Sequence, residues 1–286
     1  NTNGIAGRYP IGSVSFSMTP IATENGSMQR DFWYAVGRKL KNLETPEAVG
    51  RKAAQRTLRR LGARKIPTCE VPIIFDPETA SELLGSISAC VSGTAIYKGA
   101  SFLAGELGKN VAAAGLSVID DGRKQGGLGS RPFDGEGLPT RKTEVIRNGV
   151  LESYLLDSYS GRKLGMPSTG NAARSVSDVP GVSPTNLYVV GGDASPDEII
   201  RSVDRGLYVV ELIGFGVNHV TGDYSRGAVG LWIENGELSH PIEEVTIAGN
   251  LKDILMNIEM VGNDLEFRGN LASPTLKISN MIVAGS

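Results

Sequence analysis

Two segments of the chain carry a strong short-range signal for an antiparallel hairpin, an Asn-Gly pair between short apolar stretches. They are residues 145–151, with Asn148-Gly149 at the centre, and residues 231–238, with Asn235-Gly236. Asn and Gly tolerate the positive φ angles that a type I′ turn requires, so each segment is expected to form two paired strands. Their likeness hints at an internal duplication, although turn chemistry alone could make two hairpins match.

Helix signals occur between the expected strands. Thr45, Asp76 and Ser195 are each followed by Pro and Glu, an N-cap pattern, and Asn250 caps a fourth helix. The first helix is expected to run to residue 61, and the helix after Ser195 to stop at Gly206. Because helices do not alternate regularly with strands, the pattern argues against parallel α/β winding.

We therefore expect an α+β fold with a domain boundary near Pro67. Residues 1–66 would be the end of a smaller α+β domain, and residues 67–286 a mostly antiparallel β domain with a few packed helices. The chain opens on Asn1-Thr2-Asn3-Gly4 without a Met, which suggests that it starts inside a longer protein.

Charge and cysteine content limit the partners and the compartment. Lys and Arg number 29 and Asp and Glu 31, so the net charge of -2 gives no field that would attract nucleic acid or a membrane surface. No apolar run has membrane-spanning length, and we expect no signal peptide. Cys69 and Cys90 are the two cysteines, which makes a reducing cytoplasm the default location.

The expected first helix has one apolar side and one basic side. Val49, Ala53, Ala54, Leu58 and Leu61 form the apolar side, and Arg51, Lys52, Arg56 and Arg59 lie on the opposite arc. No stacking aromatic residues interleave with these charges, so we interpret the basic arc as a solvated helix face rather than a nucleic-acid site.

The helix expected after Asp76 has a regular apolar face and almost no reactive groups. Ala80, Leu83, Leu84, Ile87 and Val91 recur at helical spacing. The chain has two histidines, His219 and His240, with no Glu at helical spacing beside either, so a His-based zinc site is not expected. Cys90 could be a nucleophile in principle, but no His is near it in sequence, and a small core residue is the better interpretation.

Four carboxylates, Asp120, Asp121, Asp134 and Glu136, border the loop at residues 122–137. They could bind Ca²⁺, but the ordered spacing of an EF-hand is missing. Turn chemistry is the simpler explanation, because Asp and Gly are good turn residues.

Several stretches, in order and at matching spacing, resemble the TldD/PmbA family of two-subunit metallopeptidases, also called modulators of DNA gyrase. The resemblance covers nearly the whole chain. The matching stretches are residues 118–122, 133–140, 146–151, 154–157, 168–171, 191–193, 198–200, 205–208, 233–236, 247–250 and 262–265.

The resemblance implies that this chain lacks the family's metal site. TldD-type subunits carry His-Glu-x-x-x-His on the helix after Asp76 and a Cys ligand near the C-terminus. In an alignment on Leu83-Leu84, Gly85 and Cys90 stand in place of the two His and Ser86 in place of the Glu, and no Cys follows Cys90. We therefore expect no catalytic residue, metal or cofactor in this chain, and zinc in a partner subunit.

The family pattern is that of a TldE/PmbA-type subunit. It implies a heterodimer with a TldD-type subunit, or self-association, around a cavity that binds peptides or unfolded polypeptides as an added β-strand. The peptide contacts suggested are Gly214, Gly216, Asn218, His219, Asp223 and Tyr224. The alternatives are a binding-only modulator related to gyrase and a self-sufficient peptidase with an atypical site.

Overall fold

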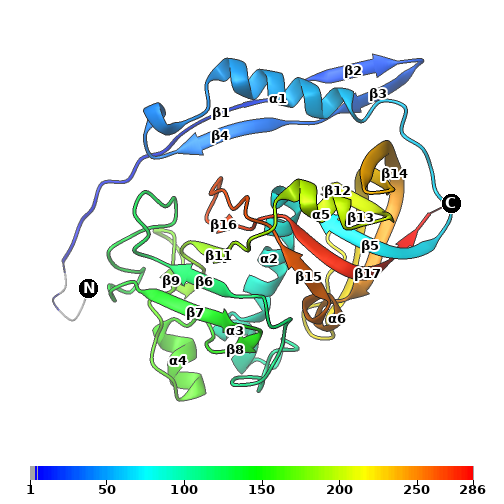
Figure 1. The fold of residues 1–286 in the computed structure, drawn as a ribbon. Coiled ribbons are helices and arrows are strands. Elements are labelled where there is room, and N and C mark those ends of the chain that lie inside the picture. The colour runs from blue at the N-terminus through cyan, green and yellow to red at the C-terminus, as the bar shows by residue number, and fades with distance from the viewer. Residues whose placement is uncertain (1–3, 5, 286) are drawn as a thin grey trace.

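The computed structural model describes residue 4 and residues 6–285. It consists of a slender N-terminal arm lying across a larger body, with the two ends of the chain on opposite sides (Figure 1). Helix α1 packs against the strands of the arm, with Trp33, Ala35, Val49 and Ala53 as its small core. The arm comprises β1 (Val14–Met18) paired antiparallel with β4 (Trp33–Gly37), β2 (Ile21–Glu24) paired with β3 (Ser27–Arg30), a 3₁₀ turn (Leu40–Asn42) and α1 (Pro46–Leu58).

The predicted extent and exposure of α1 were partly wrong. The helix ends at Leu58 rather than at residue 61, and Leu58 is 57% exposed although it was placed on the apolar side. Arg56, expected in solvent, is 7% exposed because it faces two carboxylates, as described below. Arg51 and Lys52 are exposed as predicted.

The first sheet of the body closes on itself. Strand β5 pairs in parallel with β12 and antiparallel with β17, while β14 pairs with both β13 and β17. Five strands therefore form a ring, with β15 added at the edge beside β17. The six strands are β5 (Cys69–Phe75), β12 (Arg205–Ile213), β13 (Asp223–Glu234), β14 (Glu237–Asn250), β15 (Ile258–Val261) and β17 (Leu276–Ala284).

The second sheet has the order β16-β11-β6-β7-β8 and is antiparallel except for the β11–β16 pair. A two-stranded pair, β9 with β10, lies apart from it. The strands are β6 (Val118–Asp121), β7 (Lys142–Arg147), β8 (Val150–Leu151), β9 (Ala172–Ala173), β10 (Gly181–Val182), β11 (Leu187–Val189) and β16 (Leu271–Ala272).

Helix α2 (Pro77–Cys90) joins the two sheets, since it contacts β5 and β12 of the first and β11 and β16 of the second. Its predicted apolar face is confirmed: all five positions are buried in one continuous core. In Figure 1 it lies at the centre of the body. The remaining helices are short: α3 (Gly93–Tyr97), α4 (Ser158–Leu164), α5 (Pro196–Arg201) and α6 (Leu251–Met256).

The predicted α+β class and both Asn-Gly hairpins are confirmed. Asn148 and Asn235 have φ angles of 48° and 52°, and Gly149 and Gly236 have 84° and 78°, as a type I′ turn requires. The stop at Gly206 was wrong: α5 ends at Arg201, and Gly206 belongs to β12. The domain boundary near Pro67 stays a prediction.

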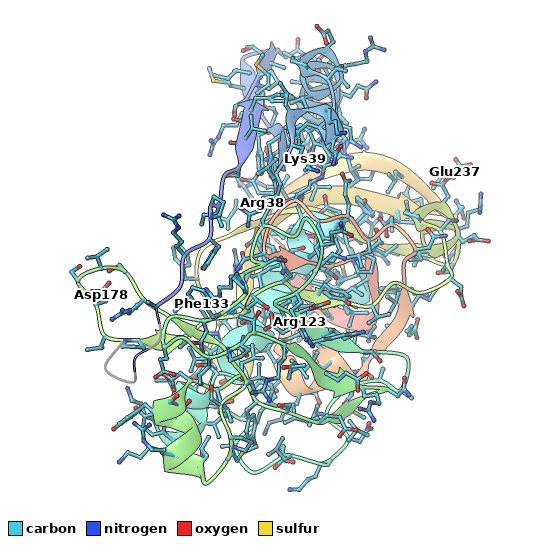
Figure 2. All side chains as sticks on the ribbon, turned by 90° about the vertical axis from the view of Figure 1, so that its left-hand side faces the viewer. Arg38, Lys39, Arg123, Phe133, Asp178 and Glu237 are labelled. Carbon is cyan, nitrogen blue, oxygen red and sulfur yellow. The ribbon has the colours of Figure 1, made fainter. Side chains whose placement is uncertain are left out.

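The arm contacts the body through Arg38, in the segment that follows β4. Figure 2 shows Arg38 and Lys39 where the arm meets the body. The Arg38 guanidinium donates from Nη1 to the carbonyl of Gly12 at 3.0 Å and from Nη2 to that of Gly127 at 3.2 Å. No helix in the described part of the chain is long and apolar enough to cross a membrane.

Candidate functional site

Helix α2 holds Gly85, Ser86 and Cys90, the three positions predicted to correspond to the family's metal motif, and these residues differ in exposure. Asp76 begins the helix: its Oδ1 accepts a hydrogen bond from the Thr79 amide at 2.9 Å. Gly85 and Ser86 are half-buried, whereas Cys90 is fully buried. Among the described residues, no three His, Cys, Asp or Glu side chains gather closely enough to hold a metal ion.

The thiol of Cys90 belongs to the central core. Burial raises the pKa of Cys90 to about 12, although a hydrogen bond with Ser101 acts in the opposite direction. The nucleophilic form of a cysteine is its thiolate, which at neutral pH is nearly absent from a group with this pKa. The geometry therefore supports the interpretation of Cys90 as a small core residue.

A groove of about 480 Å³ runs beside α2, on the side that includes Gly85. Small side chains line it on α2 and the following turn, namely Ser88, Ala89 and Ser92, and Val182 and Pro184 lie among its other lining residues. A Cβ atom added at Gly85 would meet only Leu271 Cδ1, at an ordinary 3.5 Å. The residues that line the groove include no acid–base pair.

All four loop carboxylates accept hydrogen bonds from backbone amides, Glu136 from that of Ser158 at 2.8 Å. Asp134 accepts hydrogen bonds from the amides of Glu136, Leu138 and Ala172, at 2.9, 2.9 and 3.1 Å. Asp121 accepts from the Arg123 amide at 2.9 Å. These contacts agree with the turn-chemistry explanation rather than with a calcium site.

Asp120 is the most buried of these carboxylates. It accepts from Asn171 Nδ2 at 2.7 Å, and from the Thr185 amide and hydroxyl at 2.7 and 2.9 Å. Burial raises the pKa of Asp120, and these hydrogen bonds offset part of that rise. Asp120 thus ties β6 to the segments that precede β9 and β11.

The predicted peptide contacts lie on the connection between β12 and β13 and at the start of β13. Gly214, Gly216, Asn218 and Asp223 are exposed and His219 is half-buried. The His219 carbonyl accepts from the Phe102 amide at 2.9 Å, which anchors this loop to the segment after α3. The structure thus places four of the six predicted residues on one loop and a fifth, Asp223, at the first position of β13.

Tyr224 differs from the other five residues. Its side chain is 2% exposed, and its hydroxyl has no hydrogen-bond partner among the described residues. Burial raises the pKa of this phenol. Because the Tyr224 ring is in the core, it is not part of the exposed loop surface, and the other five residues remain the predicted contacts.

Sequence reasoning missed a buried charge network between the arm and the body. Arg56 lies 3.3 Å from Asp31 and 3.5 Å from Asp76, and all three side chains are buried. Arg60 pairs with Glu211 of β12 at 2.6 Å. In the sequence, only Asp76 could have indicated this network, and its role as an N-cap already explained it. An ion pair between residues 20 positions apart has no local sequence pattern.

Two family models match the chain. The one described as PmbA/TldA metallopeptidase C-terminal domain matches residues 68–285, and the one described as PmbA/TldA metallopeptidase central domain matches residues 1–61.

Individual proteins agree with these matches. The chain is 42% identical over its whole length to Metalloprotease PmbA of Escherichia coli O157:H7, and it spans 61% of that protein. A candidate modulator of a DNA gyrase from Thermotoga maritima superposes with a TM-score of 0.87 at 32% identity, covering 94% of this chain and 62% of that one. TldE from Thermococcus kodakarensis gives 0.87 at 26% identity, with 96% and 63% covered.

Proposed function

The chain belongs to the PmbA/TldD family of metallopeptidase-like proteins, and we propose that it acts there as the subunit that carries no zinc. In this role, the chain is a TldE/PmbA-type partner of a TldD-type subunit. The partner supplies the zinc, and this chain helps to enclose the cavity and to hold the peptide.

One observation carries the proposal. Helix α2 keeps a fully buried apolar face, yet it offers Gly85, Ser86 and a core thiol at Cys90 where the family's motif has ligands and a base. A zinc site needs three or four closely placed ligands, and a lone buried thiol does not meet that need. The scaffold is therefore kept while the chemistry belongs to another chain.

The substrate we propose is a peptide or an unfolded polypeptide in extended form. An extended chain binds by pairing its main chain with an exposed strand edge and by placing side chains in shallow pockets. The groove beside α2 and the exposed residues Gly214, Gly216, Asn218, His219 and Asp223 are the surfaces that suit such a ligand. We place the complex in the cytoplasm, since Cys69 and Cys90 are unpaired.

A peptide-cleavage assay tests this function. The chain alone, a zinc-bearing TldD-type subunit alone and their mixture are each assayed with and without a chelator. We expect turnover from the mixture, its loss with chelator, and none from this chain alone. Chelator-sensitive turnover by this chain alone would contradict the proposal and favour a self-sufficient peptidase.

A reconstruction variant supplies the control for the metal site. Gly85→His, Ser86→Glu and Cys90→His together restore the residue types of the motif, but position 90 is fully buried and no Cys follows it in the sequence. Ligands without their supporting shell bind metal weakly. We expect no chelator-sensitive activity from the triple variant, and its appearance would show that only the ligands are missing.

The alternative is a binding-only protein related to gyrase, as in the name of the Thermotoga maritima protein. Stable capture of a binding partner with no peptide turnover, even when a TldD-type subunit is present, would favour this alternative. Size-exclusion chromatography of the same mixture separates this outcome from simple failure to associate.

A further inference from the structure

A second cavity, here called the junction cavity, lies between the arm and the body. Its volume is about 520 Å³, and Gly85 and the predicted peptide contacts do not line it. Its walls come from α1, β4, the first turns of α2, β12 and residues 264–271. It is therefore a separate site from the groove beside α2.

The acidic side chains that line the junction cavity all have partners. Asp264 accepts from the Thr275 amide and hydroxyl, and Glu78 accepts from the Tyr34 hydroxyl at 3.0 Å. The remaining acids pair with arginines: Asp76 with Arg56, Glu82 with Arg226, Glu211 with Arg60 and Glu266 with Arg268. The carboxylates of this wall are thus already engaged.

Two cations of the same wall have no carboxylate partner among the described residues. Lys52 rests its ammonium 4.6 Å from the centre of the Trp33 ring. The Nε and Nη2 atoms of Arg59 are buried and have no hydrogen-bond acceptor. Lys52 lies on α1 and Arg59 is the C-cap residue of that helix. The two are seven residues apart, about two turns, so they lie on the same side.

The state of Arg59 is energetically unfavourable without an acceptor. Buried N–H groups that make no hydrogen bond lose their hydration without compensation. Burial and the neighbouring Arg56 lower the pKa of Arg59, while Tyr208, Asp76 and Asp31 act in the opposite direction. A guanidinium in this position favours an acceptor with two oxygens, which can take both N–H groups at once.

The hydroxyl of Tyr208 adds a third donor. Tyr208 lies on β12 and lines the same cavity, and no hydrogen bond acts on its hydroxyl among residues 6–285. Burial raises the pKa of this phenol, so it stays a donor at neutral pH. Arg59, Tyr208 and Lys52 therefore line one cavity, and none of the three is paired with a carboxylate among the described residues.

We propose that the junction cavity binds a small ligand through an oxyanion group, a carboxylate or a phosphate, held by Arg59 with help from Tyr208 and Lys52. Charge-assisted, bidentate contact with the guanidinium gives the site its preference for a planar or tetrahedral oxyanion. The site does not depend on zinc or on a partner subunit, so it can be tested on this chain alone.

Calorimetric titration with three probes tests the proposal and identifies the source of the oxyanion. The probes are inorganic phosphate, a tripeptide with a free C-terminal carboxylate and the same tripeptide with a C-terminal amide. We expect either phosphate or the free-carboxylate peptide to bind, and the amide to bind weakly or not at all. Arg59→Gln is expected to weaken binding about tenfold or more, since it removes a charge-assisted pair of hydrogen bonds.

Matched variants keep the test independent of folding. Arg51→Gln changes an exposed arginine of α1 and should leave binding unchanged. Tyr208→Phe removes only the hydroxyl and should weaken binding without unfolding the sheet. Because Arg59 has no acceptor, Arg59→Gln should not lower the melting temperature of the free protein, and added oxyanion should raise that of the parent but not of the variant.

Two results would overturn the proposal. One is that neither phosphate nor the free-carboxylate peptide binds at millimolar concentration. The other is that binding is the same in Arg59→Gln and Arg51→Gln, which would place the oxyanion elsewhere on the surface.

Discussion

At the scale of single residues, the two cysteines of the chain differ in burial. Cys90 is 0% exposed with its pKa raised to about 12, whereas Cys69, on β5, is partly exposed. A thiol reagent reacts with the thiolate and must also reach it. Accessibility and ionisation therefore both act against Cys90.

We predict that a thiol-specific reagent near pH 8 labels one cysteine of the native protein and two after denaturation. Cys69→Ser should abolish the native label, and Cys90→Ser should leave it unchanged. Mass spectrometry of the labelled protein counts the modified residues. Rapid native labelling of Cys90 would contradict its burial and revive a thiol-dependent peptidase.

The buried carboxyl group of Asp120 makes the stability of the fold depend on pH. Its folded-state pKa is raised, so the folded protein keeps this proton to a higher pH than the unfolded chain, where an aspartate titrates near 3.9. The stability contributed by this group is therefore greatest below the unfolded pKa and falls as pH rises through the interval up to the folded pKa.

We predict that Asp120→Asn destabilises the fold by about 1–3 kcal/mol, since its new amide N–H groups face the donors of Asn171 and Thr185. The stability of the variant no longer depends on the protonation of residue 120. The difference in unfolding free energy between parent and variant should therefore shrink as pH rises above about 4. Urea unfolding of both proteins across this range measures the deficit. Asp178→Asn, on an exposed loop, is the control; a deficit that does not change with pH would contradict the raised pKa.

At the scale of elements, local signals predicted local structure. The N-caps at Asp76, Ser195 and Asn250 and the Asn-Gly turns each depend on a few neighbouring residues, and the structure confirms them. The errors arose where distant contacts decide. Leu58 was expected inside because of helical spacing, but the buried side of α1 is set by Asp31 and Asp76, which hold Arg56.

For the candidate site, the sequence led to two predictions that stay predictions: that α2 lacks the metal ligands, and that residues between Gly214 and Asp223 contact a peptide. The burial of Tyr224 could not be read from the sequence, because a β-strand residue can face either side of its sheet and only packing decides which. The junction cavity was not foreseeable, because it is made by an arm and a body that meet through residues far apart in sequence.

Helix α2 connects the two sheets through its apolar face, and Leu84 is at the centre of that face, 1% exposed. We predict that Leu84→Ala costs about 2–5 kcal/mol, as removal of a core leucine side chain does. Ser86→Ala, on the half-buried side of the same helix, should change stability by less than about 0.5 kcal/mol. Denaturant unfolding compares the two, and an unchanged midpoint for Leu84→Ala would show that α2 is not packed between the sheets.

At the scale of the whole molecule, the arm and the body share few apolar contacts, and polar residues join them. The arm has its own small core around Trp33, separate from the large core of the body. Arg56 of α1 and Arg60, two residues after the end of α1, contact carboxylates of the body, and Arg268 of the body contacts Glu44 of the arm. The orientation of the arm, and with it the shape of the junction cavity, is therefore set by a few arginines.

Arg268 makes the most extensive of these connections. Its Nη1 donates to the Tyr34 carbonyl at 2.7 Å, its Nη2 donates to Glu44 at 2.7 Å, and its guanidinium lies 4.2 Å from the centre of the Trp33 ring. The side chain is 12% exposed, so these contacts are only weakly screened by solvent. Bidentate, stacked contacts of this kind are specific to arginine.

We predict that Arg268→Gln loosens the arm without melting the body, at a cost of about 1–3 kcal/mol, because charged hydrogen bonds to β4 and Glu44 are lost. Amide hydrogen exchange should accelerate in β1 and β4, while β12, β13 and β14 keep their protection, since local openings exchange independently of the global core. Arg205→Gln removes a guanidinium that lies 5.4 Å from the Trp232 ring on the body, and it should leave the exchange of the arm unchanged. Uniform acceleration in both parts would mean that the arm and body unfold as one unit, and that Arg268 supports the whole fold rather than the position of the arm.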